Sequence, residues 1–202
     1  MLSTRRLPAV AAFILALIPT IVFGAASPAQ ADTVVFDTGH VDAFHVTAPG
    51  NALELDMKED VTGSAVRRSP ESVILHVAEA AWSEETSAVP GIDRATYYLP
   101  QTQQADLIWP GWDTQSVAGA GFSTIDLNFK RVSGPGEIYI FETGGLGGIN
   151  SVVADGSLHL SSGTTITQAN PAHRHINWAF TEPGQYTMEV SASGTNTSGT
   201  TV

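Results

Sequence analysis

The chain has 202 residues, with 20 acidic and 9 basic side chains and no cysteine. Its formal charge of −11 argues against nucleic acids and anionic lipid surfaces as partners, because both repel an acidic protein. The absence of cysteine excludes disulfides and thiolate metal ligands. An acidic surface favours solubility outside the cell and is compatible with cation binding.

The first 31 residues have the pattern of a secretory signal peptide. Arg5 and Arg6 form a basic start, residues 10–23 are mostly apolar, and residues 29–31 read Ala-Gln-Ala. We therefore expect residues 1–31 to be a signal peptide of the Sec type, leaving 7 basic and 20 acidic side chains, a charge of −13. An uncleaved membrane anchor is the alternative, but the apolar run is short for a membrane-spanning helix.

The rest of the chain is expected to be secreted or extracellular, either free or associated with the cell surface. No second long apolar stretch follows, so we expect no transmembrane segment in the mature chain. Residues 32–192 are predicted to form one domain. The Ser-, Thr- and Gly-rich residues 193–202 are predicted to be a disordered polar tail.

Short alternating apolar runs separated by Gly and Pro predict an all-β fold. Ile125, Leu127 and Phe129 alternate with polar residues, and Gly134-Pro135-Gly136 marks the turn that follows. Residues 73–77 resemble a buried strand, residues 78–88 a short helix, and residues 106–113 an aromatic turn. We expect an antiparallel β-sandwich of the immunoglobulin-like kind.

Residues 171–186 contain the most informative pattern. As a strand, this stretch places Ile176, Trp178 and Phe180 on an apolar face, and His173, His175 and Asn177 on the opposite face. Pro183-Gly184 predicts a turn. The tyrosine at 186 matches the corner that is typical of immunoglobulin-like sandwiches.

Two ligand pairs suggest a metal site. His40 and Asp42 share one face of an early strand, and His173 and His175 share one face of a late strand. Three imidazoles and a carboxylate are a suitable tetrahedral set for Zn²⁺, with Mn²⁺ as second choice. The alternative is that these are only polar, outward-facing positions of a sheet. The deciding quantity is the distance between His40 and the two later histidines.

A second hypothesis assigns surface adhesion or glycan binding to exposed aromatic rings, with Trp109 and Trp112 as ligand-binding residues. Packing of these rings in the core is the competing interpretation. The sequence has no nucleophile elbow, zinc-protease motif or phosphate loop, so we expect a binding protein without catalytic residues. A metal-dependent enzyme would require an open coordination position.

Several motifs, taken in order, resemble the choice-of-anchor M domain, also called the actinobacterial surface-anchored protein domain, over about residues 33–192. They are Gly39-His40-Val41-Asp42-Ala43, Leu99-Pro100-Gln101-Thr102-Gln103, Ile108-Trp109-Pro110-Gly111-Trp112-Asp113-Thr114, Gly134-Pro135-Gly136 and the stretch from His173 to Tyr186. The resemblance implies an exported surface protein associated with ABC transporters of the metal-uptake class. From this resemblance we transfer only the motif positions His40, Asp42, His173 and His175. Their role as metal ligands is our own inference.

Members of that family often end in a cell-wall sorting signal or a membrane helix. This sequence ends at Thr201-Val202 without an LPxTG motif or an apolar tail. We therefore expect a freely secreted product or one held by a partner. The expected partners are ABC transporter components or the cell-wall surface.

Overall fold

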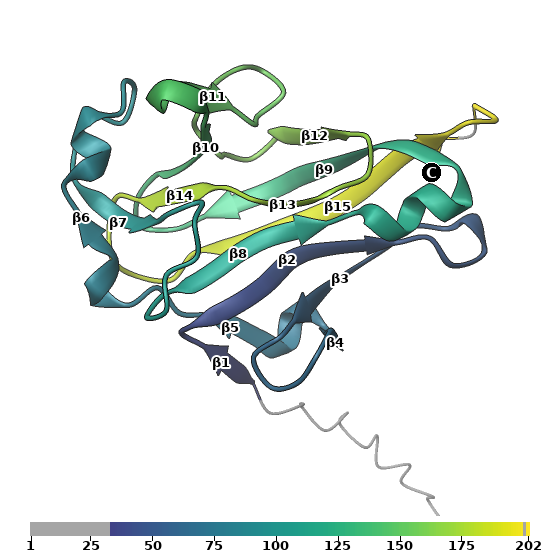
Figure 1. Ribbon diagram of the computed structural model, residues 1–202, viewed down its shortest axis with the longest axis horizontal. Helices are drawn as coiled ribbons and strands as arrows, with labels where there is room; N and C mark the ends of the chain where they lie inside the picture. Colours follow the sequence, from purple (N-terminus) through teal and green to yellow (C-terminus); the bar gives the residue numbers. More distant parts are fainter. Residues whose placement is uncertain (1–32, 200) are drawn as a thin grey trace, which may run out of the picture. The chain divides into compact units, whose positions relative to one another are not determined.

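Four β-sheets organise the residues that this computed structural model describes, 33–199 and 201–202 (Figure 1). The expected signal peptide, residues 1–31, lies outside the described residues. The strands are β1 (Val34–Phe36), β2 (Gly39–Thr47), β3 (Glu54–Glu59), β4 (Val66–Arg68), β5 (Val73–Leu75), β6 (Trp82–Ser83), β7 (Thr96–Leu99), β8 (Ile108–Asp113), β9 (Phe122–Ser133), β10 (Ile138–Thr143), β11 (Ile149–Ser151), β12 (Thr165–Ala169), β13 (His173–His175), β14 (Asn177–Phe180) and β15 (Thr187–Asn196). Short 3₁₀ helices connect them: η1 (Pro49–Asn51), η2 (Pro70–Ser72), η3 (Glu79–Ala81), η4 (Glu85–Ala88), η5 (Gln115–Ala120) and η6 (Gly145–Gly147).

The sheets pair mostly antiparallel strands. Two have five strands, in the orders β13-β8-β2-β3-β4 and β11-β10-β14-β7-β6. A third has the order β12-β9-β15, and β1 pairs with β5 in a fourth. Only the β2–β8 and β1–β5 pairs are parallel among the described strands. The predicted all-β, sandwich-like fold is confirmed, whereas an immunoglobulin-like topology stays a prediction.

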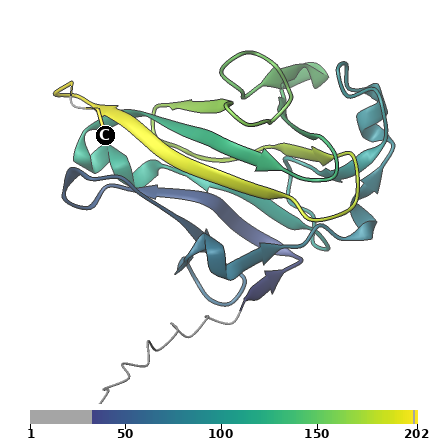
Figure 2. The same ribbon diagram turned by 180° about the vertical axis from the view of Figure 1, so that it is seen from behind.

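Apolar side chains from facing sheets form the core. Ile125, Leu127 and Phe129 of β9 are fully buried, as their alternation predicts. One edge of β9 pairs with β12, and the other edge pairs along almost its whole length with β15, as the view from behind shows (Figure 2). Burial of each such side chain stabilises the folded chain by about 1.5–3 kcal/mol, and this burial is the main force that holds the sheets together.

The corner at Tyr186 has the predicted form. Its hydroxyl donates a hydrogen bond to the backbone carbonyl of Glu182, at 2.8 Å. The ring packs so closely over Gly134 that a Cβ at that position would lie 2.1 Å from Tyr186 Cδ1. Glycine at 134 is therefore required for the corner to close.

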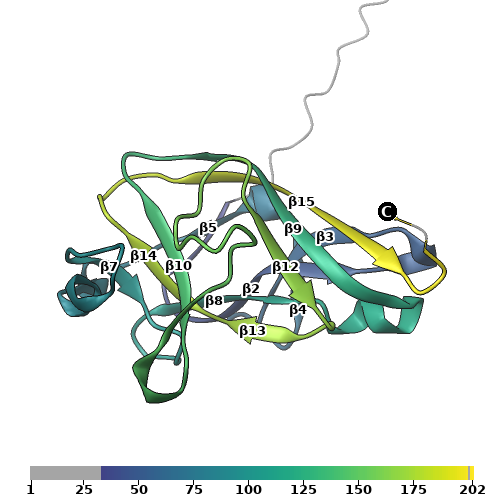
Figure 3. The same cartoon turned by 90° about the horizontal axis from the view of Figure 1, so that it is seen from above.

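Residues 106–113 were predicted as an aromatic turn, and this prediction is wrong. Six of them form β8, which lies inside a five-stranded sheet between β2 and β13 (Figure 3). The side chains of Ile108 and Trp112 are buried in the core. Their burial outweighs the turn tendency of Pro110 and Gly111.

The predicted disordered tail is also corrected. β15 continues to Asn196, and Gly194 and Val202 exchange two backbone hydrogen bonds of 2.8 and 2.9 Å. The long strand β9 supplies backbone hydrogen-bond partners to the polar residues 193–196. These residues therefore form part of a strand although they carry no apolar side chains. The domain therefore extends past residue 192.

Two smaller predictions also change. β5 covers only three residues of the predicted buried strand, and Ile74 within it is 50% exposed. The predicted helix over residues 78–88 is instead two 3₁₀ helices, η3 and η4, with β6 between them. No helix in the described part of the chain has both the length and the apolar character needed to cross a bilayer.

Candidate metal centre

Strand β8 brings the two predicted ligand pairs together. It runs parallel to β2 on one side and antiparallel to β13 on the other (Figure 3). Gly111 lies opposite both Asp42 of β2 and His175 of β13. Because side chains alternate along each strand, one face of this sheet presents both pairs. β2 and β13 do not pair with each other directly, since β8 lies between them.

The four predicted ligands converge at one point. The Nε2 atoms of His40, His173 and His175 form a triangle with sides of 3.1 Å. Asp42 Oδ1 lies 2.7 Å from His173 Nε2 and 3.7 Å from His40 Nε2. A point about 2.0–2.1 Å from all three nitrogens, the normal Zn–N distance, lies roughly 1 Å off their plane. The distance criterion set by the sequence is therefore met, and the group is a possible metal cluster.

Burial increases from one side of the cluster to the other. The side chain of His173 is 34% exposed and that of His40 is 15% exposed, whereas Asp42 is fully buried. Neither oxygen of Asp42 makes a hydrogen bond of good geometry with another described residue. Its contacts are ion pairs instead. A buried carboxylate in this state fits the donor set of a bound cation.

Asp60 orients the first imidazole. Its Oδ2 lies 2.7 Å from His40 Nδ1, and its Oδ1 accepts a hydrogen bond of 2.7 Å from the backbone N–H of Ala65. The hydrogen bond from Ala65, which has the larger effect, and the contact with His40 hold the pKa of Asp60 below its usual value. Donation from Nδ1 to the carboxylate leaves the lone pair on Nε2, which is the atom that faces the cluster.

Trp109 and Gly111 fix the imidazole of His175. The indole of Trp109 stacks on His175 with centroids 3.5 Å apart and planes 10° apart, and its Nε1 donates to the carbonyl of Gln101. A Cβ on Gly111 would lie 2.7 Å from His175 Nδ1. Burial, and then the neighbouring His40 and His173, lower the pKa of His175 to about 4. His175 is therefore neutral at physiological pH, which is the form that binds metals.

Lys58 of β3 balances the acidic groups beneath the cluster. Its Nζ lies 2.9 Å from Asp42 Oδ2 and 2.5 Å from Asp113 Oδ2. Burial alone lowers the pKa of Lys58, but the hydrogen bond to Asp113 and the ion pair with Asp42 outweigh it and raise this pKa. Burial likewise raises the pKa of Asp113, and the bond from Lys58 outweighs it and lowers that pKa. With neutral imidazoles, three carboxylates (Asp42, Asp60 and Asp113) and one ammonium leave two negative charges, which match a divalent ion.

Asn177 was expected beside the two late histidines, and this expectation is wrong. The predicted strand changes sheet at Ile176, so β13 and β14 belong to different five-stranded sheets. The Asn177 side chain accepts hydrogen bonds from the Tyr98 hydroxyl and the backbone N–H of Gln101, at 2.6 and 2.8 Å. It ties this junction together and takes no part in the cluster.

The aromatic platform of Trp109 and Trp112 is also corrected. Trp112 is fully buried, and its Nε1 donates to Gln168 Oε1 at 2.9 Å. Positions of a strand that differ by an odd number point to opposite faces, so Trp109 and Trp112, which are three apart, lie on opposite faces of β8. Core packing therefore holds for Trp112, while Trp109 belongs to the cluster through His175.

Sequence reasoning missed the supporting residues Lys58, Asp60, Gly111 and Asp113. Their signal was the alternation Trp-x-Gly-x-Asp at residues 109–113, together with Lys58 and Asp60 two positions apart. This alternation becomes readable only when residues 108–113 are treated as a strand.

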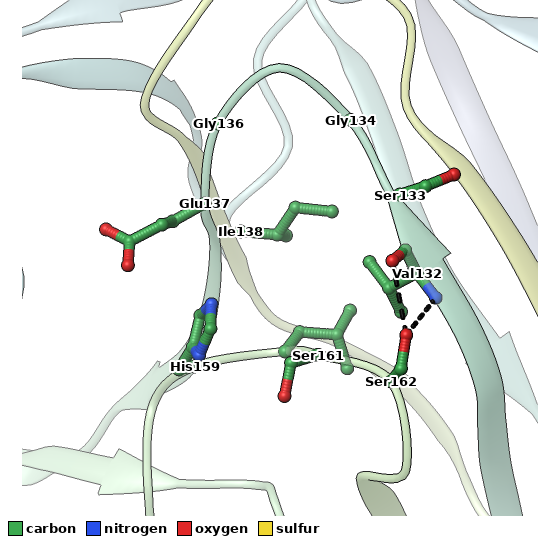
Figure 4. A pocket seen from close by; sticks show the side chains of 10 residues that line it. Val132, Ser133, Gly134, Gly136, Glu137, Ile138, His159, Ser161 and Ser162 are labelled. Carbon is green, nitrogen blue, oxygen red and sulfur yellow. Dashed lines mark hydrogen bonds between the residues drawn. The ribbon is translucent and has the colours of Figure 1, made fainter.

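A separate cavity of about 410 Å³ lies where the turn after β9 faces residues 159–162 (Figure 4). Its lining includes Glu137, His159 and Ser162, and the Ser162 hydroxyl is hydrogen-bonded to the backbone of Val132. None of the four converging ligands lines it. The chemistry of the cluster is therefore independent of this hollow.

Comparisons with models of protein families, with curated proteins and with solved structures find no match to this chain. The function is therefore inferred from the geometry of the site and from the sequence itself.

Proposed function

We propose that the protein binds a divalent transition metal, Zn²⁺ first and Mn²⁺ second, through His40, Asp42, His173 and His175. The convergence of three Nε2 atoms at 3.1 Å from one another is the observation that carries this proposal. Neutral imidazoles are good ligands for zinc, and a donor set with three of them suits zinc better than manganese.

The arrangement favours binding over catalysis. Three nitrogens and one carboxylate oxygen complete a tetrahedral zinc site, whereas catalytic zinc sites keep a position for water or substrate. Asp42 is held from below by Lys58 with its other oxygen directed toward the histidines, so the carboxylate is available as the fourth donor. We therefore propose a non-enzymatic role.

We further propose that the protein is exported, cleaved after Ala31 and acts at or outside the cell surface, in support of an ABC-type metal-uptake system. The pattern of residues 1–31 supports export. The motif resemblance to the choice-of-anchor M domain supports the transporter association. The metal site supplies the chemical basis for the transporter association.

The test is calorimetry and elemental analysis on protein stripped with a chelator and titrated with zinc or manganese chloride. We expect one zinc per chain, with weaker manganese binding. The double variant His173→Ala/His175→Ala should lose at least about 100-fold in zinc affinity, since loss of an outer partner alone costs 10–100-fold. His76→Ala is the matched control, because His76 is exposed and lies outside the cluster. Absence of stoichiometric metal, or equal affinity in the double variant, would refute the proposal.

A further inference from the structure

Lys58 has an unusual place next to the proposed ligands. It lies on β3 in register with Asp42 of β2, and its side chain is only 17% exposed. The ammonium contacts Asp42 Oδ2 at 2.9 Å and Asp113 Oδ2 at 2.5 Å. A permanent cation therefore shares a buried carboxylate with the position where a metal ion would bind.

The two oxygens of Asp42 have different partners. Oδ2 faces Lys58, while Oδ1 faces His173 at 2.7 Å and His40 at 3.7 Å. Asp42 is therefore oriented to give one oxygen to the ion, which matches tetrahedral rather than higher coordination. An ion on Oδ1 lies roughly 5 Å from the ammonium if its Zn–O distance is normal.

The same contact opposes tight metal binding. A divalent ion and an ammonium at this separation repel each other, and the low dielectric of a buried site strengthens the repulsion. When the ion is absent, Lys58 compensates the charge of Asp42, so the metal-free state avoids an unpaired buried carboxylate. Both effects shift the balance toward release.

We propose that Lys58 keeps the bound metal exchangeable, by holding Asp42 as a one-oxygen ligand and by repelling the ion. This inference rests on the proposed metal site and specifies how the site is used: the ion is cargo that the protein takes up and gives back. Lys58 is a positioning residue, since it acts on the ion through Asp42 and through its charge.

A purely structural role for Lys58 predicts a different outcome. If Lys58 only stabilised the fold, its removal would lower both the stability of the metal-free protein and its affinity for metal. The proposed role predicts opposite signs, because the stability of the metal-free protein falls while zinc affinity rises. Measuring both quantities on the same variants separates the two roles.

The experiment compares Lys58→Met and Lys58→Gln with the wild type and with Lys130→Met. Lys130 is the other lysine of the chain and is exposed, so it controls for loss of a positive charge. The glutamine variant keeps a neutral hydrogen-bond donor near Asp42 and Asp113, which protects folding. Zinc affinity and release rate are measured by competition with a chelator, and stability by thermal unfolding of the metal-free protein.

We expect both Lys58 variants to bind zinc at least about tenfold more tightly and to release it more slowly, with a lower melting temperature without metal. Lys130→Met should match the wild type. Unchanged or weaker zinc affinity in both Lys58 variants, in a wild type that does bind zinc, overturns this inference alone. Failure of the wild type to bind zinc overturns the proposed function and this inference with it.

Discussion

Gly111 gives the most direct test of how β8 builds the site. Because Gly111 has no side chain, the neighbouring strand β13 can pack close to β8. A Cβ at this position would lie 2.3 Å from the carbonyl oxygen of Arg174 and 2.7 Å from His175 Nδ1. Both distances are shorter than real Cβ contacts, and the first involves backbone that cannot rotate away. Gly111→Ala therefore forces β13 away from β8.

The expected cost follows from overpacking. Inserting one methyl group into a close-packed region costs about 1–3 kcal/mol. For a domain of this size, 1 kcal/mol corresponds to a fall of about 2–4 °C in the melting temperature, so we expect a fall of about 4–8 °C for a mid-range cost. Displacement of His175 should also weaken zinc binding at least about tenfold, because ligand distances tolerate only about 0.2 Å.

The assay is thermal unfolding followed by zinc titration of the same samples. Gly119→Ala is the matched control, since a Cβ there meets nothing within 4 Å and its backbone does not need glycine. This variant should stay within about 0.5 kcal/mol of the wild type and keep its zinc affinity. If Gly111→Ala also keeps wild-type stability and zinc affinity, then β13 does not lie against β8 as described, and the geometry of the site is refuted.

Two further predictions concern protonation and the tyrosine corner. Because the pKa of His175 is about 4 in the folded chain, below the ordinary 6.5, the unfolded chain takes up this proton first as pH falls. Stability of the metal-free protein is therefore lost from about pH 6.5 down to about pH 4, by about 2 kcal/mol for a ring that keeps some water contact. Urea unfolding across this range should show a flatter profile for His175→Asn, and identical profiles would contradict the prediction. Tyr186→Phe removes the hydrogen bond to Glu182 and should lower the unfolding free energy by about 0.5–1.5 kcal/mol with zinc affinity unchanged; a change in zinc affinity in calorimetry would show that the corner and the site are coupled.

The sequence was sufficient for features that depend on local periodicity. Ile125, Leu127 and Phe129 alternate with polar residues, and all three are buried. The corner at Tyr186 was readable because it needs only a turn followed by a tyrosine at a fixed offset. The ligand types were also readable, since two residues at positions i and i+2 share a face of any strand.

Sequence reasoning failed where a tertiary contact outweighed a local preference. Pro110 and Gly111 favour a turn, but burial of Trp112 and pairing on both edges make residues 108–113 a strand. The polar residues 193–196 lack apolar side chains, yet they pair with β9. Backbone pairing has no signature in side-chain pattern, so neither element was visible from composition or periodicity.

The four ligands illustrate the same division. The sequence by itself determined that His40 and Asp42 share a face, and that His173 and His175 share another. Only the tertiary structure decided that the two faces are one, because β8 pairs with β2 on one edge and with β13 on the other and leaves a side-chain gap at Gly111. Alternation along a strand is a local property of the backbone, whereas the order of strands in this sheet depends on pairing between residues 60 to 69 positions apart.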